Sequence, residues 1–389
     1  MTGELANLFI TLDFSTISQV IVLGFIGGVL SGFIGSGGAF FMTPGMMNVG
    51  VNGVVAVASN ITHKFGKAMM GSKKHGEMGN VDKRLGLFLL ITAIVGIRLA
   101  VWINSLLFHG GGDGHGAAKG AGANLYISVV FVSILTIVAV SMLKDLMKKG
   151  EEGAGPSKKI VEFLANLHIP PFIFFKTADV RVSLWVLLPV GLATGYLAGT
   201  IGVGGFVGVP AMIYVFGVPT AVAAGTELYL AMFMGGFGAL NYAWEGFVDI
   251  RLTMLLMSGS LVGVYIGAYG VKVVGEKYIR LVTCLIIVLC VLSRAISIPM
   301  YLRQLGFLNL DPGLDPWFNN ASKYVLFASG IIGVVMILTS VFRAYNTRKK
   351  IHLTLAYTKT NPEGLVITKR NEALRRQSDG RKTASAHSG

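Results

Sequence analysis

The chain has 389 residues, of which 53% are hydrophobic and only 13% are charged, and it carries a formal net charge of +14. Since a soluble domain carries about 25% charged residues, this composition excludes an ordinary soluble protein and predicts an all-α, polytopic membrane protein. The positive charge alone does not indicate an anionic substrate, because half of it lies in the tail 346–389, where basic residues more often serve topology or attraction to anionic lipid. No nucleic-acid partner is expected.

Apolar segments recur along the chain, and about 20 apolar residues suffice for a helix to cross a bilayer. In the first half we expect full spans over 16–34, 53–73, 85–107 and 124–144, with a short helix over 39–50. The pattern then restarts, with full spans over 183–201, 219–243, 251–274 and 278–299 and a short helix over 206–216. A further full span is expected over 323–345. The prediction is therefore about nine full spans plus two short, broken or re-entrant helices.

Lys and Arg gather in four connecting regions, and short loops rich in these residues stay on the cytoplasmic side of a membrane. The regions are the loop after 53–73, the linker before 183–201, the turn after 251–274 and the chain after 323–345. The N-terminus and two other loops are poor in Lys and Arg. We therefore expect a multi-pass protein of the cell inner (cytoplasmic) membrane, with its N-terminus outside and its C-terminus in the cytoplasm.

The two halves of the chain align at an offset of 167 residues, which places Gly28 on Gly195, Gly96 on Gly263 and Val81-Asp82 on Val248-Asp249. By its charge, the loop after 53–73 lies inside, whereas the equivalent segment of the second half, WEGFVDIR, must lie outside. The two halves should therefore be antiparallel. This is the inverted-topology repeat of secondary transporters, in which the binding site lies near the middle of the bilayer.

The repeat divides the chain into five parts. We expect a first repeat, a cytoplasmic linker, a second repeat, an outer loop with an extra transmembrane helix, and a basic cytoplasmic tail, over 1–145, 146–181, 182–300, 301–345 and 346–389 respectively. The linker holds a polar run, KDLMKKGEEGAGPSKK, followed by the proline-interrupted stretch HIPPFIFFKTADVR.

Each half contains a glycine-rich break followed by a short helix with a proline, as GSGGAFFMTP and GVGGFVGVP. A break at membrane depth frees backbone N–H and C=O groups at a cost of several kcal/mol each, so it persists only inside protein or against a wet cavity. It also opens a helix whose N-terminus carries partial positive charge. Two facing breaks would cradle an anion, with the substrate-binding residues Gly35, Ser36, Gly37, Gly38, Gly202, Gly204 and Gly205. The alternative is close helix packing, which we expect for Gly24, Gly28 and Gly32.

The expected helix 53–73 carries a polar stripe, since Asn60, His63, Lys64 and Lys67 recur at helical spacing and share one face. A lysine at mid-depth costs about 2.5–3.5 kcal/mol on insertion scales, so Lys64 should face protein or water. The functional interpretation is a cationic wall of an anion pathway, with His63 taking part in proton coupling. The alternative is that Lys67 extends to the cytoplasmic interface and that His63 is a packing residue without a role in transport.

Glu227 occupies in the second half the position that Asn60 occupies in the first, and Thr226 likewise matches Ser59. A glutamate in mid-membrane must be protonated or paired, and Lys64 is an obvious partner. We predict Glu227 as a proton-coupling carboxylate, and the alternative is a static ion pair that holds the two halves together. Ser59, Asn60 and Thr226 are predicted to hydrogen-bond an oxyanion from opposite sides.

Arg98, in the expected helix 85–107, is another partner for Glu227. Because a guanidinium binds sulfonate or carboxylate oxygens through two parallel N–H bonds, we predict Arg98 as a substrate ligand, the alternative being a buried structural partner. Cys284 and Cys290 are expected to be buried apolar residues. The sequence predicts no metal site, no cofactor and no catalytic residues, hence no enzyme, because the spans contain no nucleophile set or metal cluster.

The paired motifs SGFIGSGGAFFMTP and AGTIGVGGFVGVP, together with the doubled unit of four to five helices, resemble the TauE/SafE sulfite exporter family of anion permeases. The resemblance covers roughly residues 16–300. It implies transport of sulfite, sulfoacetate, thiosulfate or another small sulfur or carboxylate anion. The loop HGGGDGHGAAKGAGAN, the linker, the last helix and the tail depart from the compact core of that family.

The sequence thus predicts a secondary permease or exporter of a small anion, driven by a proton or ion gradient because no nucleotide-binding loop is found. The alternative is a membrane anchor or subunit that moves no solute and binds a partner through the linker and the tail. Besides the anion and the lipid bilayer, the expected partners are a second copy of the chain or an unknown cytoplasmic protein.

Overall fold

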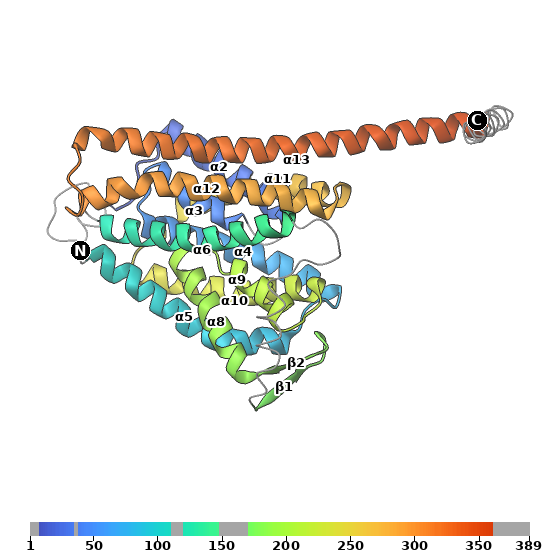
Figure 1. Cartoon of the computed structure of the whole chain (residues 1–389), viewed down its shortest axis with the longest axis horizontal. Coiled ribbons are helices and arrows are strands. Elements are labelled where there is room, and N and C mark those ends of the chain that lie inside the picture. Colours follow the sequence, from blue (N-terminus) through green and yellow to red (C-terminus); the bar gives the residue numbers. More distant parts are fainter. Residues whose placement is uncertain (1–7, 35–37, 110–119, 148–169, 361–389) are drawn as a thin grey trace, which may run out of the picture. The chain divides into compact units, whose positions relative to one another are not determined.

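The structure is a computed structural model that describes residues 8–34, 38–109, 120–147 and 170–360 (Figure 1). The chain forms two compact units, Met1–Leu338 and Thr339–Gly389. The first unit is a bundle of helices, and the described part of the second unit is the end of a helix that stops at Thr360. The predicted site residues Gly35, Ser36 and Gly37 lie outside the described residues.

The helices follow the predicted order. In the first half they are α2 (Phe14–Ile34), α3 (Ala39–Asn48), α4 (Gly53–Glu77), α5 (Lys83–His109) and α6 (Ala121–Met147). In the second half they are α8 (Leu184–Ile201), α9 (Gly205–Pro210), the π-helical turn η1 (Ala211–Val215), α10 (Thr220–Trp244), α11 (Ile250–Val273) and α12 (Glu276–Gln304). A 3-10 turn, η2 (Pro312–Leu314), leads into α13 (Asp315–Thr360). The last helix therefore begins earlier and ends later than the span predicted over 323–345.

The fold class is an all-α polytopic membrane protein, as predicted. Among the described residues, seven helices are long and apolar enough to cross a membrane, namely α2, α5, α6, α8, α11, α12 and α13. The helices α4 and α10 have 25 residues each but fall outside this set, and they pack against each other. The count of nine full spans therefore stays a prediction.

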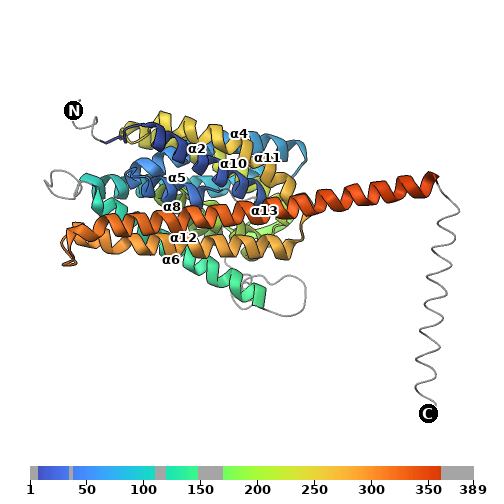
Figure 2. The same ribbon diagram turned by 90° about the horizontal axis from the view of Figure 1, so that it is seen from above.

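The two halves pack through crossed pairs of helices. Helix α2 packs along α11, α5 along α8, α4 along α10 and α6 along α12 (Figure 1, Figure 2). The offset that places Gly28 on Gly195 also places α2 on α8, α5 on α11 and α4 on α10. It therefore exchanges the first two pairs and maps the pair α4–α10 onto itself. Such contacts are those of two units related by a pseudo-two-fold axis, so they support the predicted repeat. The sidedness of the two halves stays a prediction.

Glycines bring the crossed helices into backbone contact. A Cβ atom added to Gly28 of α2 would lie 2.7 Å from the Cα atom of Ser260 in α11. One added to Gly195 of α8 would lie 2.5 Å from the Cα atom of Ala93 in α5. Ala93 and Ser260 are related by the same offset as the two glycines. The small residues thus serve close packing, as expected for the first helix.

A β-hairpin lies directly before α8, in the linker, where the sequence predicted no helix or strand. Its strands β1 (Phe172–Phe175) and β2 (Val180–Ser183) are antiparallel. Asp82, which begins α5 by accepting a hydrogen bond from the backbone N–H of Leu85, also fastens the hairpin. Its Oδ2 atom accepts bonds from the backbone N–H groups of Thr177 and Ala178 at 2.9 and 3.0 Å.

Arg294 of α12 is fully buried and fastens the short helix α3 to its surroundings. Its Nη2 atom donates hydrogen bonds to the Oδ1 atom of Asn48, the last residue of α3, and to the hydroxyl groups of Ser297 and Ser322. Ser322 belongs to α13. Because these acceptors are neutral, the buried guanidinium depends on each of them to replace its hydration. No sequence pattern predicted this role for Arg294.

Replacing Asn48 by leucine is expected to lower the free energy of unfolding by about 1.5–3 kcal/mol, because a buried charged donor loses an acceptor. The measurement is the thermal midpoint of the detergent-solubilised protein. Asn48→Asp serves as the control, since it keeps an oxygen acceptor and should stay close to the unmodified protein. A midpoint unchanged by Asn48→Leu would contradict the fastening role of Arg294.

Candidate functional site

A cavity of about 190 Å³ lies between α4 and α10. Residues of α2, α3 and α9 complete its wall. Its polar lining consists of Ser31, His63, Lys64, Lys67, Thr220 and Glu227. The rest of the lining is apolar, with Met42 and Leu228 among it. The cavity thus combines apolar walls with a few convergent polar groups, which is typical of small-molecule sites.

Three residues of the polar stripe of α4, His63, Lys64 and Lys67, line this cavity, whereas Asn60 does not. The Lys64 Nζ atom lies 4.0 Å from the Glu227 Oε1 atom, and the two side chains are only 14% and 7% exposed. This is the partner expected for Glu227. The ion pair joins α4 of the first half to α10 of the second.

Two serines from other helices hold the basic side chains in place. The His63 Nε2 atom lies 2.7 Å from the Oγ atom of Ser260 in α11, and the Lys67 ammonium donates to the Oγ atom of Ser31 in α2. Sequence reasoning missed both serines, because each lies in an apolar helix with no charged residue near it in the sequence. Only the contact with a charged side chain distinguishes them from packing residues.

The carboxylate of Glu227 is buried, and among the described residues neither of its oxygen atoms receives a hydrogen bond. A carboxylate without hydrogen bonds is costly to bury, so Lys64 alone does not satisfy it. Gly208 of α9 makes room for it, since a Cβ atom there would lie 2.7 Å from the Oε2 atom. The group is therefore suited to accept a proton or a hydrogen bond from a bound solute.

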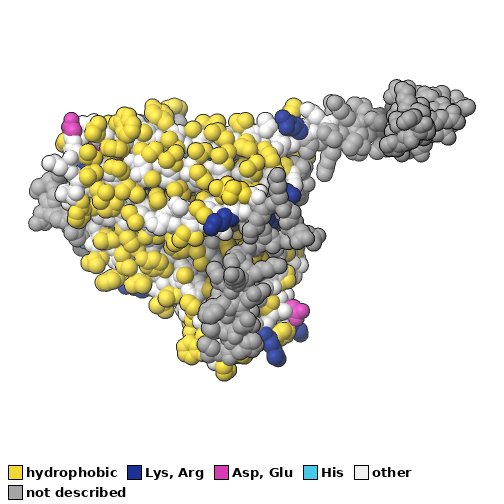
Figure 3. All heavy atoms as spheres, in the orientation of Figure 1, with side chains coloured by type: hydrophobic (Ala, Val, Ile, Leu, Met, Phe, Trp, Pro, Cys, Tyr) yellow, Lys and Arg dark blue, Asp and Glu magenta, His cyan; other side chains and the backbone are white. Residues whose placement is uncertain are grey.

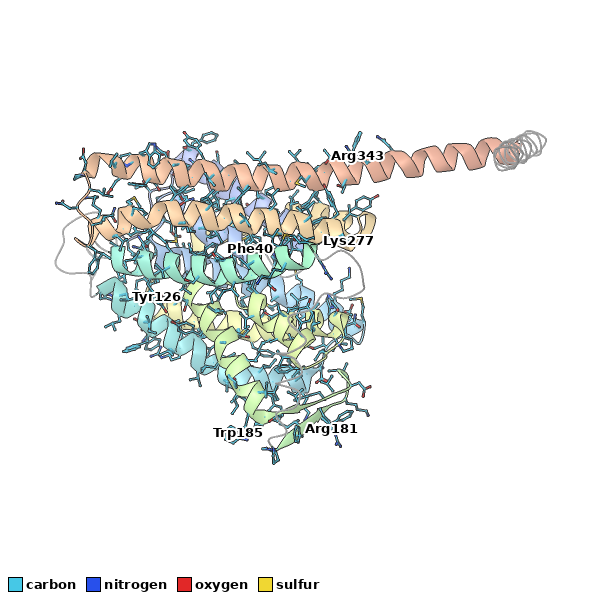
Figure 4. All side chains as sticks on the ribbon, in the orientation of Figure 1. Phe40, Tyr126, Arg181, Trp185, Lys277 and Arg343 are labelled. Atoms are coloured by element: carbon cyan, nitrogen blue, oxygen red, sulfur yellow. The ribbon has the colours of Figure 1, made fainter. Side chains whose placement is uncertain are left out.

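The two short helices meet at their first turns. The rings of Phe40 in α3 and Phe206 in α9 contact edge to face, with centroids 5.1 Å apart, and Phe40 is labelled within the bundle in Figure 4. Ala39, the first residue of α3, lines the cavity beside the basic side chains. The positive end of the α3 dipole therefore adds to the field of Lys64 and Lys67.

The described glycines of the two breaks sit in tight packing contacts. Gly38 caps α3 and abuts the backbone of Gly27. Gly202 has a φ of 80°, a conformation that favours glycine, and lies against the amide of Asn60. Gly204 abuts the carbonyl group of Thr194, and Gly205 begins α9. None of these four glycines lines the cavity, and their role as substrate ligands stays a prediction.

The remaining predicted ligands lie outside the cavity lining. Asn60 donates to the Ala39 carbonyl and the Thr43 hydroxyl, at 3.0 and 2.8 Å. Ser59 donates to the carbonyl oxygen of Asp249 at 3.4 Å.

Thr226 and Arg98 are also engaged elsewhere. The Thr226 Oγ1 atom accepts a hydrogen bond from the backbone N–H of Asp82 at 3.0 Å. Ser59 and Thr226, like Asp249 and Asp82, are 167 residues apart, and each hydroxyl group contacts the backbone of the aspartate that precedes α11 or α5. Arg98 is exposed and donates to the Asn241 Oδ1 atom at 2.8 Å.

A bundle of apolar helices packed in pairs, with a cavity lined by charged residues between α4 and α10, fits a polytopic membrane transporter. The family model described as "Sulfite exporter TauE/SafE" matches residues 20–294, and the chain belongs to this family.

Three proteins of Bacillus subtilis (strain 168) are similar to this chain, and each is named a probable membrane transporter protein. YjnA is 25% identical over 264 residues, which cover 64% of this chain and 89% of the relative. YdhB is 22% identical, with 64% and 88% covered, and YunE is 21% identical, with 69% and 94% covered. No solved structure matches the chain. Family and relatives identify a membrane transporter rather than an enzyme.

Proposed function

We propose that this protein is a secondary transporter that carries a small anion through the cavity between α4 and α10. The observation that carries the proposal is the convergence of Lys64, Lys67 and His63 on the same cavity as Glu227. Two lysines against one glutamate give the cavity an excess of basic groups. Because the side chains of Lys64 and Glu227 are only 14% and 7% exposed, their charges act on a solute more strongly than they would in solution.

The family supports sulfite, another sulfur oxyanion or an organosulfonate as the substrate, and the cavity volume of about 190 Å³ suits an anion of this size. Transport is proposed to be coupled to a proton or ion gradient, with Glu227 and His63 as the coupling groups. We also propose that the glycine breaks orient the two short helices toward the substrate. Gly38 and Gly205 are glycines at the starts of these helices in the part of the chain that the structure describes.

The basic loops support insertion in the cell inner membrane with the N-terminus outside and the C-terminus in the cytoplasm. Association with a second copy of the chain or with a cytoplasmic protein is part of the same set of proposals. The alternative of an anchor that moves no solute is less well supported, because an anchor has no need of a buried cavity lined by an ion pair.

The test is flux through the purified protein in proteoliposomes, with sulfite, thiosulfate, sulfoacetate, acetate and sulfate offered in turn. We expect saturable flux of at least one sulfur oxyanion or sulfonate. Absence of flux for the whole panel, in a preparation that is monodisperse and thermally stable, would overturn the proposal and favour the anchor.

Replacing Glu227 by glutamine should weaken the dependence of the initial rate of flux on pH, because the amide keeps the size of the side chain but does not titrate, and only the contribution of His63 is left. The measurement is the rate in proteoliposomes at a series of pH values, with and without an imposed pH gradient. Asn241→Asp, which leaves Glu227 intact, serves as a control for changed surface charge. A pH profile equal to that of the unmodified protein would make Glu227 the static partner of Lys64.

A further inference from the structure

The β1–β2 hairpin presents two different faces, because side chains alternate along a strand. Phe175 and Val182 are buried on the inner face, where Phe175 contacts Phe88 of α5 edge to face. On the outer face Phe174 is 46% exposed and stands opposite Arg181, which is exposed as well. The outer face thus presents an aromatic and a basic side chain next to each other.

The hairpin is placed at the end of two membrane-spanning helices. It runs directly into α8, and the backbone N–H of Leu184 donates to the Pro171 carbonyl at 3.0 Å. Trp185, in the first turn of α8, is 56% exposed and donates its indole N–H to the Pro170 carbonyl at 3.2 Å. Trp185 and Arg181 lie together at the lower edge of the bundle in Figure 4. Tryptophan at the end of a span marks the membrane–water interface.

The neighbouring surface is apolar along α5, where Leu87, Ile91 and Val95 form an exposed stripe. Such a stripe on a spanning helix faces lipid. Figure 3 shows hydrophobic side chains over this lower edge, with basic and acidic groups beside them at the same end. The aromatic groups of the hairpin thus continue the lipid-facing surface to its boundary with water.

Basic side chains surround these aromatic groups. Lys83, Arg84, Lys176 and Arg181 are all exposed, and the Arg84 Nη1 atom lies 3.5 Å from the Phe174 carbonyl oxygen. Two acidic residues lie near these basic side chains. Asp82 is buried and bound to the hairpin turn, and Asp179 is exposed. The cluster has a net positive charge, which complements anionic lipid head groups at the surface.

We propose that the outer face of the hairpin, together with Trp185, binds anionic lipid at the membrane interface. The phenyl and indole rings enter the boundary of the acyl chains, and the basic side chains pair with head-group phosphates. Asp82 connects this contact to α10, since its carboxylate holds the hairpin turn and its N–H donates to Thr226, the neighbour of Glu227. An effect of lipid on flux rests on the proposed function, whereas lipid binding does not.

Lipid contact can be measured without any transport assay. The chain has 4 tryptophans, so a variant in which Trp102, Trp244 and Trp317 are replaced by phenylalanine leaves Trp185 as the only one. This variant is reconstituted in vesicles that contain a fixed fraction of brominated phosphatidylglycerol or brominated phosphatidylcholine. We expect quenching of the Trp185 emission by both lipids, and about twofold stronger quenching by the anionic one.

The charge variants decide the interpretation. Lys176→Gln with Arg181→Gln should remove the preference for the anionic lipid, whereas Lys176→Arg with Arg181→Lys should keep it. Lys73→Gln with Lys74→Gln, which removes two exposed lysines of α4 that are not part of the hairpin, is the matched control and should also keep it. Equal quenching by the two lipids, or no quenching by either, would overturn the proposal. Normal lipid preference without flux would instead count against the proposed function alone.

Discussion

Replacing Lys64 by glutamine is expected to lower the rate of anion flux about tenfold or more. At an effective dielectric constant near 20, two unit charges about 4 Å apart interact by about 4 kcal/mol. Each 1.4 kcal/mol corresponds to about a factor of ten, so loss of even part of this attraction produces an effect of that size. Lys64 is 14% exposed and lines the cavity, hence solvent replaces little of what the ammonium provides.

The measurement is the initial rate of flux in proteoliposomes at equal protein incorporation. Arg98→Gln is the matched control, because it also removes a cation from a membrane helix but from an exposed position outside the cavity lining. We expect its rate to remain within about twofold of the unmodified protein. Similar losses for both variants would show that total charge, and not the position of Lys64, determines the rate.

The loss in the Lys64 variant has a second source, because Glu227 remains buried without its cation. The double variant Lys64→Gln with Glu227→Gln separates the loss of substrate attraction from the effect of an unpaired Glu227. If the lysine serves only to compensate the glutamate, the double variant should recover flux. If Lys64 attracts the substrate, as proposed, the double variant should stay as slow as the single one.

The polar part of the site was predictable where a single helix contains the pattern. His63, Lys64 and Lys67 share a face by spacing alone, and a glutamate at membrane depth requires a cation. The repeat does not help here, because the positions equivalent to these three residues are Leu230, Ala231 and Met234. The basic groups are thus carried by one half of the chain, and only the structure shows which elements from the other half face them.

Other features depend on contacts between distant segments and leave no local pattern. Ser31 and Ser260 look like ordinary small residues until His63 and Lys67 are placed against them. Arg294 lies within a span that the sequence predicted correctly, yet its role depends on Asn48 and Ser322 from two other helices. The hairpin strands have four residues each, which is too short for alternation to be distinguished from an irregular linker.

Substitutions at Gly28 and Gly195 are expected to prevent folding, and to do so to a similar degree. A Cβ atom at either position would meet the backbone of the facing helix, at Ser260 or at Ala93 respectively. Overpacking typically costs about 1–3 kcal/mol when side chains can shift, and here two backbones would have to move apart. Gly28→Val and Gly195→Val should therefore each remove most of the protein from the monodisperse fraction after extraction in detergent.

Gly76→Val is the matched control, because Gly76 lies in α4 with nothing within 4 Å of an added Cβ atom. It should leave both the monodisperse yield and the thermal midpoint close to those of the unmodified protein. The comparison also tests the repeat, since the two contacts are equivalent only if α2 on α11 and α8 on α5 are the same packing in two copies. A folded, fully active Gly28→Val protein beside an unfolded Gly195→Val protein would show that the two halves do not share this interface, and the predicted repeat would lose its main structural support.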